Sequence, residues 1–331
     1  GRLRGLVASD TITVTGDVTV SADGTFNHTS VWTGSINHGS LTIASGGTYL
    51  ATSGTTTVNN EGSDGVCIRN NGTFTHNSGL VTITREDHTT LVWVAANQRF
   101  NNLTVNLGAS SRVCTLSGEF DSTRYVEGDL TVTNSKFDTN NCATFRIDGD
   151  VSLTSSATLT CGTSTCSFGS MSIASGTTLS ASSGTTTITG KESGACFANS
   201  GTFTHNKGKV SFTKSGGTWT TISNSGGQSF YDVNVDSSTG TGIYTNDPLT
   251  ILNNFTLVRG TFIANDDGSH DGDITVHGLT SIGGGANATK LENDGRTLQL
   301  ESVTVLSNGT IDVAEGTNNF GGIRNVGGTI S

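Results

Sequence analysis

Aliphatic residues and small polar residues alternate along many short segments of the chain. This alternation places an aliphatic row on one face of a β-strand and a row of Thr, Ser or Asn on the other face. Gly, Asn-Gly, Asp-Gly and Ser-Gly separate the segments, and no segment has a sustained helical period. The pattern therefore predicts an all-β chain of short strands. Examples are residues 11–15, 17–21, 80–84, 103–106, 130–133 and 303–305.

A long internal repeat accompanies this alternation. Residues 72–77, Gly-Thr-Phe-Thr-His-Asn, recur at 201–206, an offset of 201 − 72 = 129 residues. A third, partial copy begins near Ser302, where residues 323–325 match 68–70 as Ile-Arg-Asn. Self-similarity of this kind is the sequence signature of repeat architectures. Other matching segments are 43–46 with 173–176, 53–57 with 183–187, and 65–67 with 194–196.

Each long repeat contains several strand-turn units of about 20 residues, the size typical of solenoids. One such unit cannot bury its own apolar face and must stack on its neighbours. We therefore expect a parallel β-solenoid (β-helix), and the alternative is an array of β-sandwiches. The expected organisation is one continuous solenoid over 1–331, with N-terminal coils at 1–41, long repeats at 42–170 and 171–300, and a partial repeat at 301–331.

Composition narrows the functional classes. Of the 331 residues 45 are Gly and 1 is Pro, and 32% are hydrophobic, which a thin solenoid core tolerates. The formal charge of -10, with 17 basic and 27 acidic residues, makes a phosphate-binding surface improbable, so we expect no nucleic-acid partner. No apolar run approaches the roughly 20 residues of a membrane-spanning helix, so we expect no membrane insertion.

The repeat units resemble those of phage tail-fibre and virion proteins and of large secreted bacterial surface proteins with adhesin-like repeats. The segments that carry this resemblance are 201–212, 229–235, 249–251 and 254–257, and it covers the chain from about Leu41 onward. It implies a scaffold located outside the cell, at the cell surface or in a virion. It transfers no catalytic residue, because such repeats serve as scaffold in many contexts.

The densest acidic stretch, residues 265–273, is the candidate metal site. Asp266, Asp267, Asp271 and Asp273 surround two glycines, and oxygen ligands at such a turn suit Ca²⁺. The stretch lacks the downstream Glu of an EF-hand loop, and no calcium-binding nonapeptide repeat occurs in the chain. The alternative is a solvated turn between coils, and we expect no other cofactor.

Three acidic pairs are candidates for a glycoside-hydrolysing site, because such a site needs two carboxylates in a cleft. They are Asp148 with Asp150, Glu61 with Asp64, and Glu119 with Asp121. Aromatic residues make up only 6% of the chain, so a sugar-stacking platform is not evident. We expect these carboxylates to cap turns and the chain to have no catalytic residue.

Histidine and cysteine positions follow the repeat. His76 and His205 are equivalent, which favours a structural place in the turn over a catalytic one. Cys67 and Cys196 are also equivalent and are expected to be packed thiols, whereas Cys161 and Cys166 could bridge a turn in an oxidising compartment. The six cysteines form no zinc-binding pattern.

Rows of Thr facing outward suggest a further hypothesis, binding to ice. In-register Thr-x-Thr rows would match an ice lattice, but the Thr positions wander between the 20-residue units, which argues against this function.

A solenoid has free strand edges at its ends, and such edges polymerise unless they are capped. We therefore expect either head-to-tail stacking between subunits or continuation into a further domain, and we interpret the chain as a non-enzymatic homo-oligomer that forms a fibre. The alternative is a receptor-binding fibre or adhesin that recognises cell-surface glycans through loops such as 86–88 or 265–273.

Overall fold

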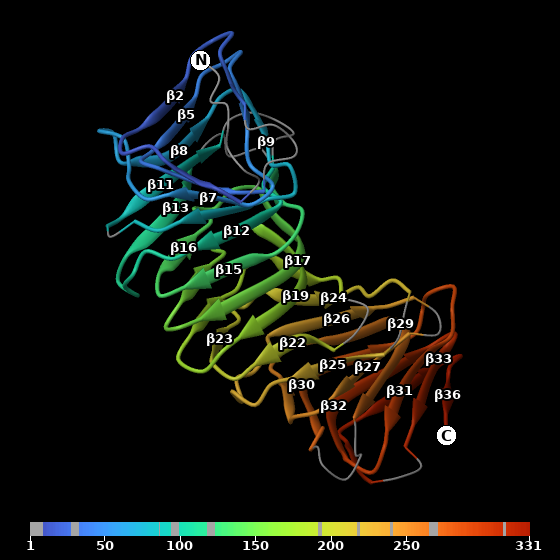
Figure 1. Ribbon diagram of the computed structural model, residues 1–331. Coiled ribbons are helices and arrows are strands. Elements are labelled where there is room, and N and C mark those ends of the chain that lie inside the picture. The colour runs from blue at the N-terminus through green and yellow to red at the C-terminus, as the bar shows by residue number, and fades with distance from the viewer. Residues whose placement is uncertain are drawn as a thin grey trace. The chain divides into compact units, whose positions relative to one another are not determined.

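The computed structural model describes residues 9–27, 33–85, 87–93, 99–117, 123–190, 194–216, 219–238, 241–264, 271–313 and 316–331. All regular elements in these ranges are β-strands, and they coil as a parallel β-solenoid of about 12 turns with about 23 residues per turn (Figure 1). The predicted fold class is therefore confirmed. None of the described residues forms a helix long and apolar enough to cross a membrane. The chain divides into two compact units, 1–164 and 165–331.

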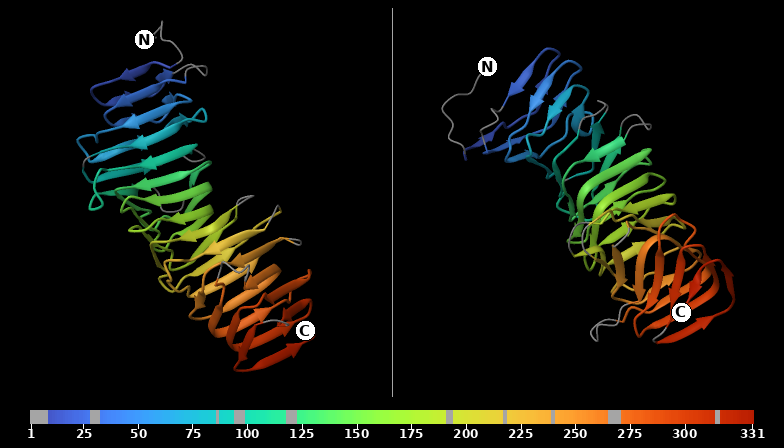
Figure 2. Two further views of the ribbon diagram at one scale, coloured as in Figure 1. Left: turned by 60° about the horizontal axis from the view of Figure 1, so that its bottom comes forward. Right: turned by 90° about the vertical axis from the view of Figure 1, so that its right-hand side faces the viewer.

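The first unit has three β-sheet faces, and each coil adds a strand to a face in parallel register, as Figure 2 shows. The eleven-residue strand β17 bends to serve two of these faces. The first face contains β1 (Thr11–Thr13), β4 (Ser35–His38), β7 (Thr55–Val58), β10 (Leu80–Ile83), β12 (Asn102–Val105), β15 (Leu130–Thr133) and the second half of β17 (Thr144–Thr154). The second face contains β2 (Val18–Val20), β5 (Leu41–Ile43), β8 (Val66–Asn70), β11 (Thr89–Trp93), β13 (Val113–Ser117), β16 (Lys136–Asp138) and β18 (Thr158–Thr160). The third face contains β3 (Thr25–Asn27), β6 (Thr48–Leu50), β9 (Thr73–Thr75), β14 (Thr123–Val126) and the first half of β17.

The second unit is built in the same way. One of its faces contains β19 (Thr165–Ile173), β21 (Thr185–Ile188), β24 (Lys209–Phe212), β26 (Asp232–Asp236), β29 (Phe255–Ala264), β30 (Ile274–Ile282), β32 (Thr297–Leu306) and β35 (Ile323–Val326). The next contains the second halves of β19 and β29 with β22 (Ala195–Asn199), β25 (Thr220–Ser223), β27 (Gly242–Thr245), β31 (Thr289–Asn293), β33 (Gly309–Asp312) and β36 (Thr329–Ile330). The third face contains β20 (Thr178–Ser180), β23 (Thr202–Thr204), β28 (Leu249–Ile251) and β34 (Thr317–Phe320). The first halves of β30 and β32 lie between β28 and β34 on this face.

The predicted alternation is what fills the interior. In β10 and β12 the side chains of Val81, Ile83, Leu103 and Val105 point inward and are at most 2% exposed. Aromatic rings of successive coils also stack inside the first unit, with Tyr49 between Phe26 and Phe74 at ring-centroid distances of 5.2 and 5.7 Å. The core therefore forms from contacts between neighbouring coils, as expected of a solenoid.

Candidate functional site

The structure describes only part of the predicted Ca²⁺ loop. Asp266 and Asp267 lie outside the described residues. Asp273 accepts a hydrogen bond at Oδ1 from the backbone N–H of Thr297 at 2.7 Å, and Asp271 lies 3.6 Å from an Arg296 guanidinium nitrogen. No group of three or more His, Cys, Asp or Glu side chains is placed to hold a metal ion within the described ranges. The Ca²⁺ site stays a prediction.

Glu61 and Asp64, one of the three acidic pairs, lie between β7 and β8 of the first unit, and each contacts an arginine. Glu61 Oε1 is 2.7 Å from an Arg85 nitrogen, and Asp64 Oδ2 is 2.6 Å from Arg69 Nη2. The hydrogen bond from Arg69 lowers the pKa of the Asp64 carboxyl. The general acid of a glycosidase needs a raised pKa, so Asp64 does not fit that role.

The pair Asp148 and Asp150 lies on either side of Gly149 in β17. Asp148 Oδ1 is 2.6 Å from Arg146 Nε, and the backbone N–H of Asp150 donates to Asp129 Oδ1 at 2.8 Å. These contacts link neighbouring residues and neighbouring coils. The third pair, Glu119 with Asp121, lies outside the described residues.

The two equivalent histidines occupy the same turn. His76 Nδ1 accepts a hydrogen bond from the backbone N–H of Ser78 at 3.0 Å, and His205 Nδ1 accepts one from Lys207 at 2.9 Å. In both turns the two residues after the histidine have positive φ, as at Asn77 (φ 47°) and Ser78 (φ 61°). The histidine side chain therefore completes a left-handed turn, which is the structural place that the repeat predicted.

The cysteines are buried, unbridged thiols. Cys67 and Cys196 each donate a hydrogen bond from Sγ to a backbone oxygen of the next coil, that of Thr90 and of Thr221, both at 3.4 Å. Burial raises the pKa of Cys196 to about 11, so this thiol is not a reactive nucleophile. The prediction of packed thiols at 67 and 196 is confirmed. The free cysteines are Cys67, Cys114, Cys142, Cys161, Cys166 and Cys196.

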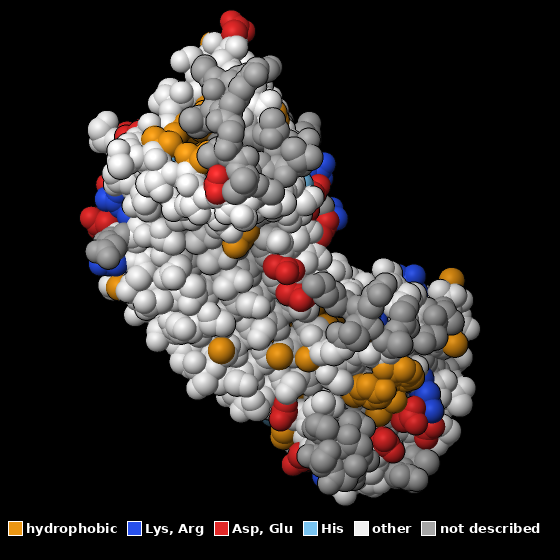
Figure 3. All heavy atoms as spheres, viewed as in Figure 1, with side chains coloured by type: hydrophobic (Ala, Val, Ile, Leu, Met, Phe, Trp, Pro, Cys, Tyr) orange, Lys and Arg blue, Asp and Glu red, His pale blue; other side chains and the backbone are white. Residues whose placement is uncertain are grey.

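One aromatic pair on the surface was not anticipated. Trp219 is 38% exposed and stacks on Tyr244 of β27, with ring centroids 5.0 Å apart and planes 19° apart. The indole lies against Gly242, where a Cβ would collide with the ring. The two residues are 244 − 219 = 25 positions apart, about one turn, which is the signal that could have found them. A hydrophobic patch lies over this region of β25 and β27 (Figure 3).

The last coil differs from all coils beneath it in the exposure of its apolar residues. Ile323 pairs with Val303 of the preceding coil, and Ile330 pairs with Ile311. Val303 and Ile311 are 1% and 0% exposed, whereas Ile323 and Ile330 are 46% and 41% exposed. Val326 is likewise 44% exposed. The residues that should form core are therefore open at this end of the second unit.

The outer backbone edge of this coil is also open. Among the described residues, β34 and β35 pair only with β32, and β36 pairs only with β33. Peptide groups on the far side of each strand are placed to pair with one more parallel strand. The last described coil is the candidate site for adding one more coil, from this chain or from another copy, because it combines an apolar row with strand edges that are unpaired among the described residues.

Comparisons with known proteins add no relative: no family model, no curated protein and no solved structure matches the chain.

Proposed function

We propose that this chain is a non-enzymatic structural protein that builds an extracellular or virion-associated fibre by end-to-end stacking of β-solenoid subunits. The observation that supports the proposal is the parallel stacking of coils, because each strand pairs with strands of the neighbouring coils and a coil of another copy can add in the same way. The setting outside the cell rests on the resemblance of the repeats to those of phage fibres and bacterial surface proteins.

Both features of the last coil favour a further coil as the occupant. A strand from a second copy placed on β34, β35 and β36 would satisfy the free peptide groups and cover the apolar row. Each added coil lies about 4.8 Å above the last, the spacing already used inside the solenoid. The contact is heterologous, and stacking along the solenoid axis adds each copy on top of the last, so it generates an open filament and not a closed ring.

The test is light scattering and negative-stain electron microscopy of the chain over a concentration series. We expect filaments of uniform width that lengthen with concentration. The double variant Ile323→Lys/Ile330→Lys places two charges in the end contact and should leave single subunits with an unchanged circular dichroism spectrum. Leu279→Lys is the matched control, because Leu279 is 41% exposed but lies on the side of the solenoid. That variant should still form filaments.

Two outcomes would overturn the proposal. One is a wild-type chain that stays monomeric at the highest concentration, and the other is filament growth that survives the double variant. A capped, monomeric rod would instead favour the glycan-binding alternative, for which the exposed Trp219–Tyr244 pair is the supporting observation.

A further inference from the structure

The first face of the first unit carries a column of small polar side chains in continuous register. On the inward side of its strands lie Ile36, Val58, Ile83, Val105, Val132 and Leu153, each 0% exposed. The residues between them point outward and are half-buried by their neighbours. One column runs through successive coils as Thr13, Asn37, Thr57, Thr82, Thr104, Thr131 and Ser152.

A second column runs beside the first. Two positions further along each strand lie residues 59, 84, 106, 133 and 154, which are Asn, Thr, Asn, Thr and Thr. The strand register pairs Thr133 with Thr154 directly. Thr-x-Thr occurs in two of these five coils, at 82–84 and 131–133, and Asn or Ser replaces one Thr in the other three. The first column keeps its register although the spacing in sequence varies, so the expectation that Thr positions wander does not hold for that column.

The two columns themselves hold no charged residue, because none of the strand segments 11–13, 35–38, 55–58, 80–83, 102–105, 130–133 and 151–154 contains Asp, Glu, Lys or Arg. Asp129 and Asp150 border the columns, two positions before Thr131 and Ser152 on the same side of the strands. The surface over β12 and β15 is accordingly largely free of charged side chains in Figure 3. An ionic group holds a tight hydration shell of its own, so its absence leaves the hydroxyl array to decide how water is arranged.

The spacing of the array is fixed by the backbone. Hydroxyls in one column lie about 4.8 Å apart, the distance between strands, and the two columns are roughly 6.6 Å apart, twice the rise per residue. Thr is β-branched, so its hydroxyl and methyl groups keep a preferred orientation. Each hydroxyl both donates and accepts hydrogen bonds. The result is a rigid two-dimensional lattice of donors, acceptors and methyl groups.

We propose that this face, the outward side of β1, β4, β7, β10, β12, β15 and the second half of β17, binds the surface of ice. The spacing of about 4.8 Å within a column is close to the shorter oxygen repeat of the hexagonal ice lattice. Waters held by the hydroxyls at this spacing join the solid with little further ordering. Many such weak contacts on one rigid surface act together, so adsorption is strong although each contact is weak.

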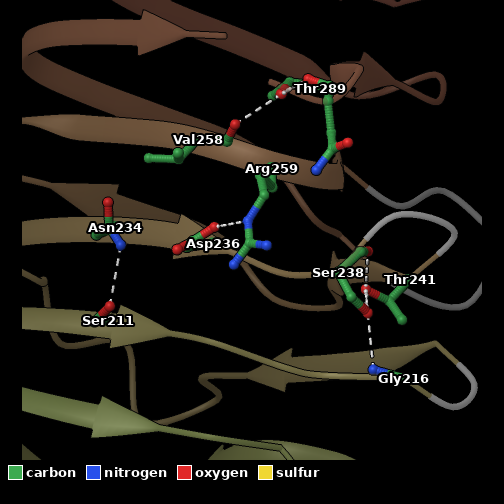
Figure 4. A network of polar contacts seen from close by, with 10 residues as sticks. Ser211, Gly216, Asn234, Asp236, Ser238, Thr241, Val258, Arg259 and Thr289 are labelled. Atoms are coloured by element: carbon green, nitrogen blue, oxygen red, sulfur yellow. Dashed lines mark hydrogen bonds and ion pairs between the residues drawn. The ribbon is translucent and has the colours of Figure 1, made fainter. Parts of the chain in front are cut away.

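The second unit offers a built-in comparison. Its corresponding column, Ser167, Thr187, Ser211, Asn234, Thr256, Ser281 and Thr304, is also in register. There, however, Asn234 donates to Ser211 Oγ at 3.0 Å, and the neighbouring outward position holds an ion pair of Asp236 with Arg259 (Figure 4). In the second unit a side-chain bond joins two members of the column itself, whereas in the first unit the bonds of Asn102, Asp129 and Asp150 lie beside the column, so we assign ice binding to the first unit alone.

The experiment measures thermal hysteresis and inhibition of ice recrystallisation with the full chain. Wild type should show both. Thr104→Arg places a long cation in the centre of the lattice and should abolish the hysteresis, whereas Thr104→Ser keeps the hydroxyl and should retain most of it. Thr256→Arg is the matched control, because Thr256 lies in the corresponding column of the second unit, paired with Asn234. It should leave the activity unchanged, with circular dichroism confirming that all variants fold.

Three results would overturn the proposal: no hysteresis for wild type at millimolar concentration, full activity in Thr104→Arg, or equal losses in Thr104→Arg and Thr256→Arg. Binding to crystalline cellulose or chitin without any effect on ice would assign the face to a flat polysaccharide instead. The end contact of the fibre uses none of these residues, so either proposal can fail without the other.

Discussion

His38 is a titratable side chain inside the core of the first unit. It is 0% exposed, its Nδ1 lies 3.2 Å from the carbonyl oxygen of Gly39, and its Nε2 lies 3.4 Å from the hydroxyl of the equally buried Tyr49. Burial lowers the pKa of His38 below its ordinary value of 6.5. The same burial raises the pKa of the Tyr49 hydroxyl, so this pair is neutral in the folded chain at pH 7.

The first prediction is therefore acid sensitivity that originates at His38. Below about pH 6.5 the unfolded chain binds a proton that the folded chain resists, so stability is full above that pH and declines as the pH falls. The decline is about 1.4 kcal/mol per pH unit until the folded pKa is reached. Denaturant unfolding at pH 7 and pH 5 measures it, and His38→Gln should reduce the difference. His88→Gln, at an exposed histidine, should not, and an unchanged pH dependence in His38→Gln would contradict the assignment.

At the scale of single strands, the sequence predicted elements well and their register poorly. The alternation at residues 130–133 corresponds to β15 (Leu130–Thr133), because inward aliphatic and outward polar residues leave one choice of face. The coils, however, average about 23 residues and not about 20. From Thr82 to Thr104 the step is 104 − 82 = 22 residues, and from Thr104 to Thr131 it is 131 − 104 = 27. Corner loops absorb the difference, so sequence spacing could not show that the Thr columns align.

The same limit applies to the candidate sites. The repeat located the turn histidines and the packed cysteines, because equivalent positions have equivalent contacts. It could not locate the Trp219–Tyr244 stack, which joins two strands, nor the exposure of Ile323, which depends on there being no strand above it among the described residues. The sequence therefore predicted the positions that repeat, whereas the contacts between side chains of different coils could be found only in the structure.

The corners are held by carboxylate and amide side chains that bond the next coil. Asn102 Oδ1 accepts a hydrogen bond from the backbone N–H of Asp129, and Asp129 Oδ1 accepts one from Asp150, both at 2.8 Å. We expect Asp129→Ala to lower the free energy of unfolding by about 1 kcal/mol, the usual net value of one such bond. Asp129→Asn keeps an acceptor oxygen and should stay close to wild type. Urea titration of the three proteins checks this, and equal stability of Asp129→Ala and wild type would contradict it.

At the scale of the whole molecule, stability should be local. Each coil packs on its immediate neighbours, so the stability of a solenoid is roughly a sum of coil and nearest-neighbour terms. Each of the two compact units has its own row of buried aliphatic residues. Leu103 represents the first unit at 2% exposed, and Leu291 represents the second at 0% exposed. A cavity at one of these positions should therefore destabilise the neighbouring coils, and the destabilisation should decrease over several coils.

The last prediction follows from this locality. Leu103→Ala should lower the local free energy of unfolding of the coils around Leu103 by about 2 to 5 kcal/mol, as for other buried leucines. Hydrogen exchange with mass spectrometry at low denaturant should then show faster exchange in peptides from β10, β12 and β15 and unchanged exchange in peptides from β29, β31 and β33. Leu291→Ala is the matched control and should give the reverse. Equal acceleration across both sets of peptides in either variant would mean that the chain unfolds as one cooperative body, and a fibre built from it would then break as whole subunits and not by fraying from an end.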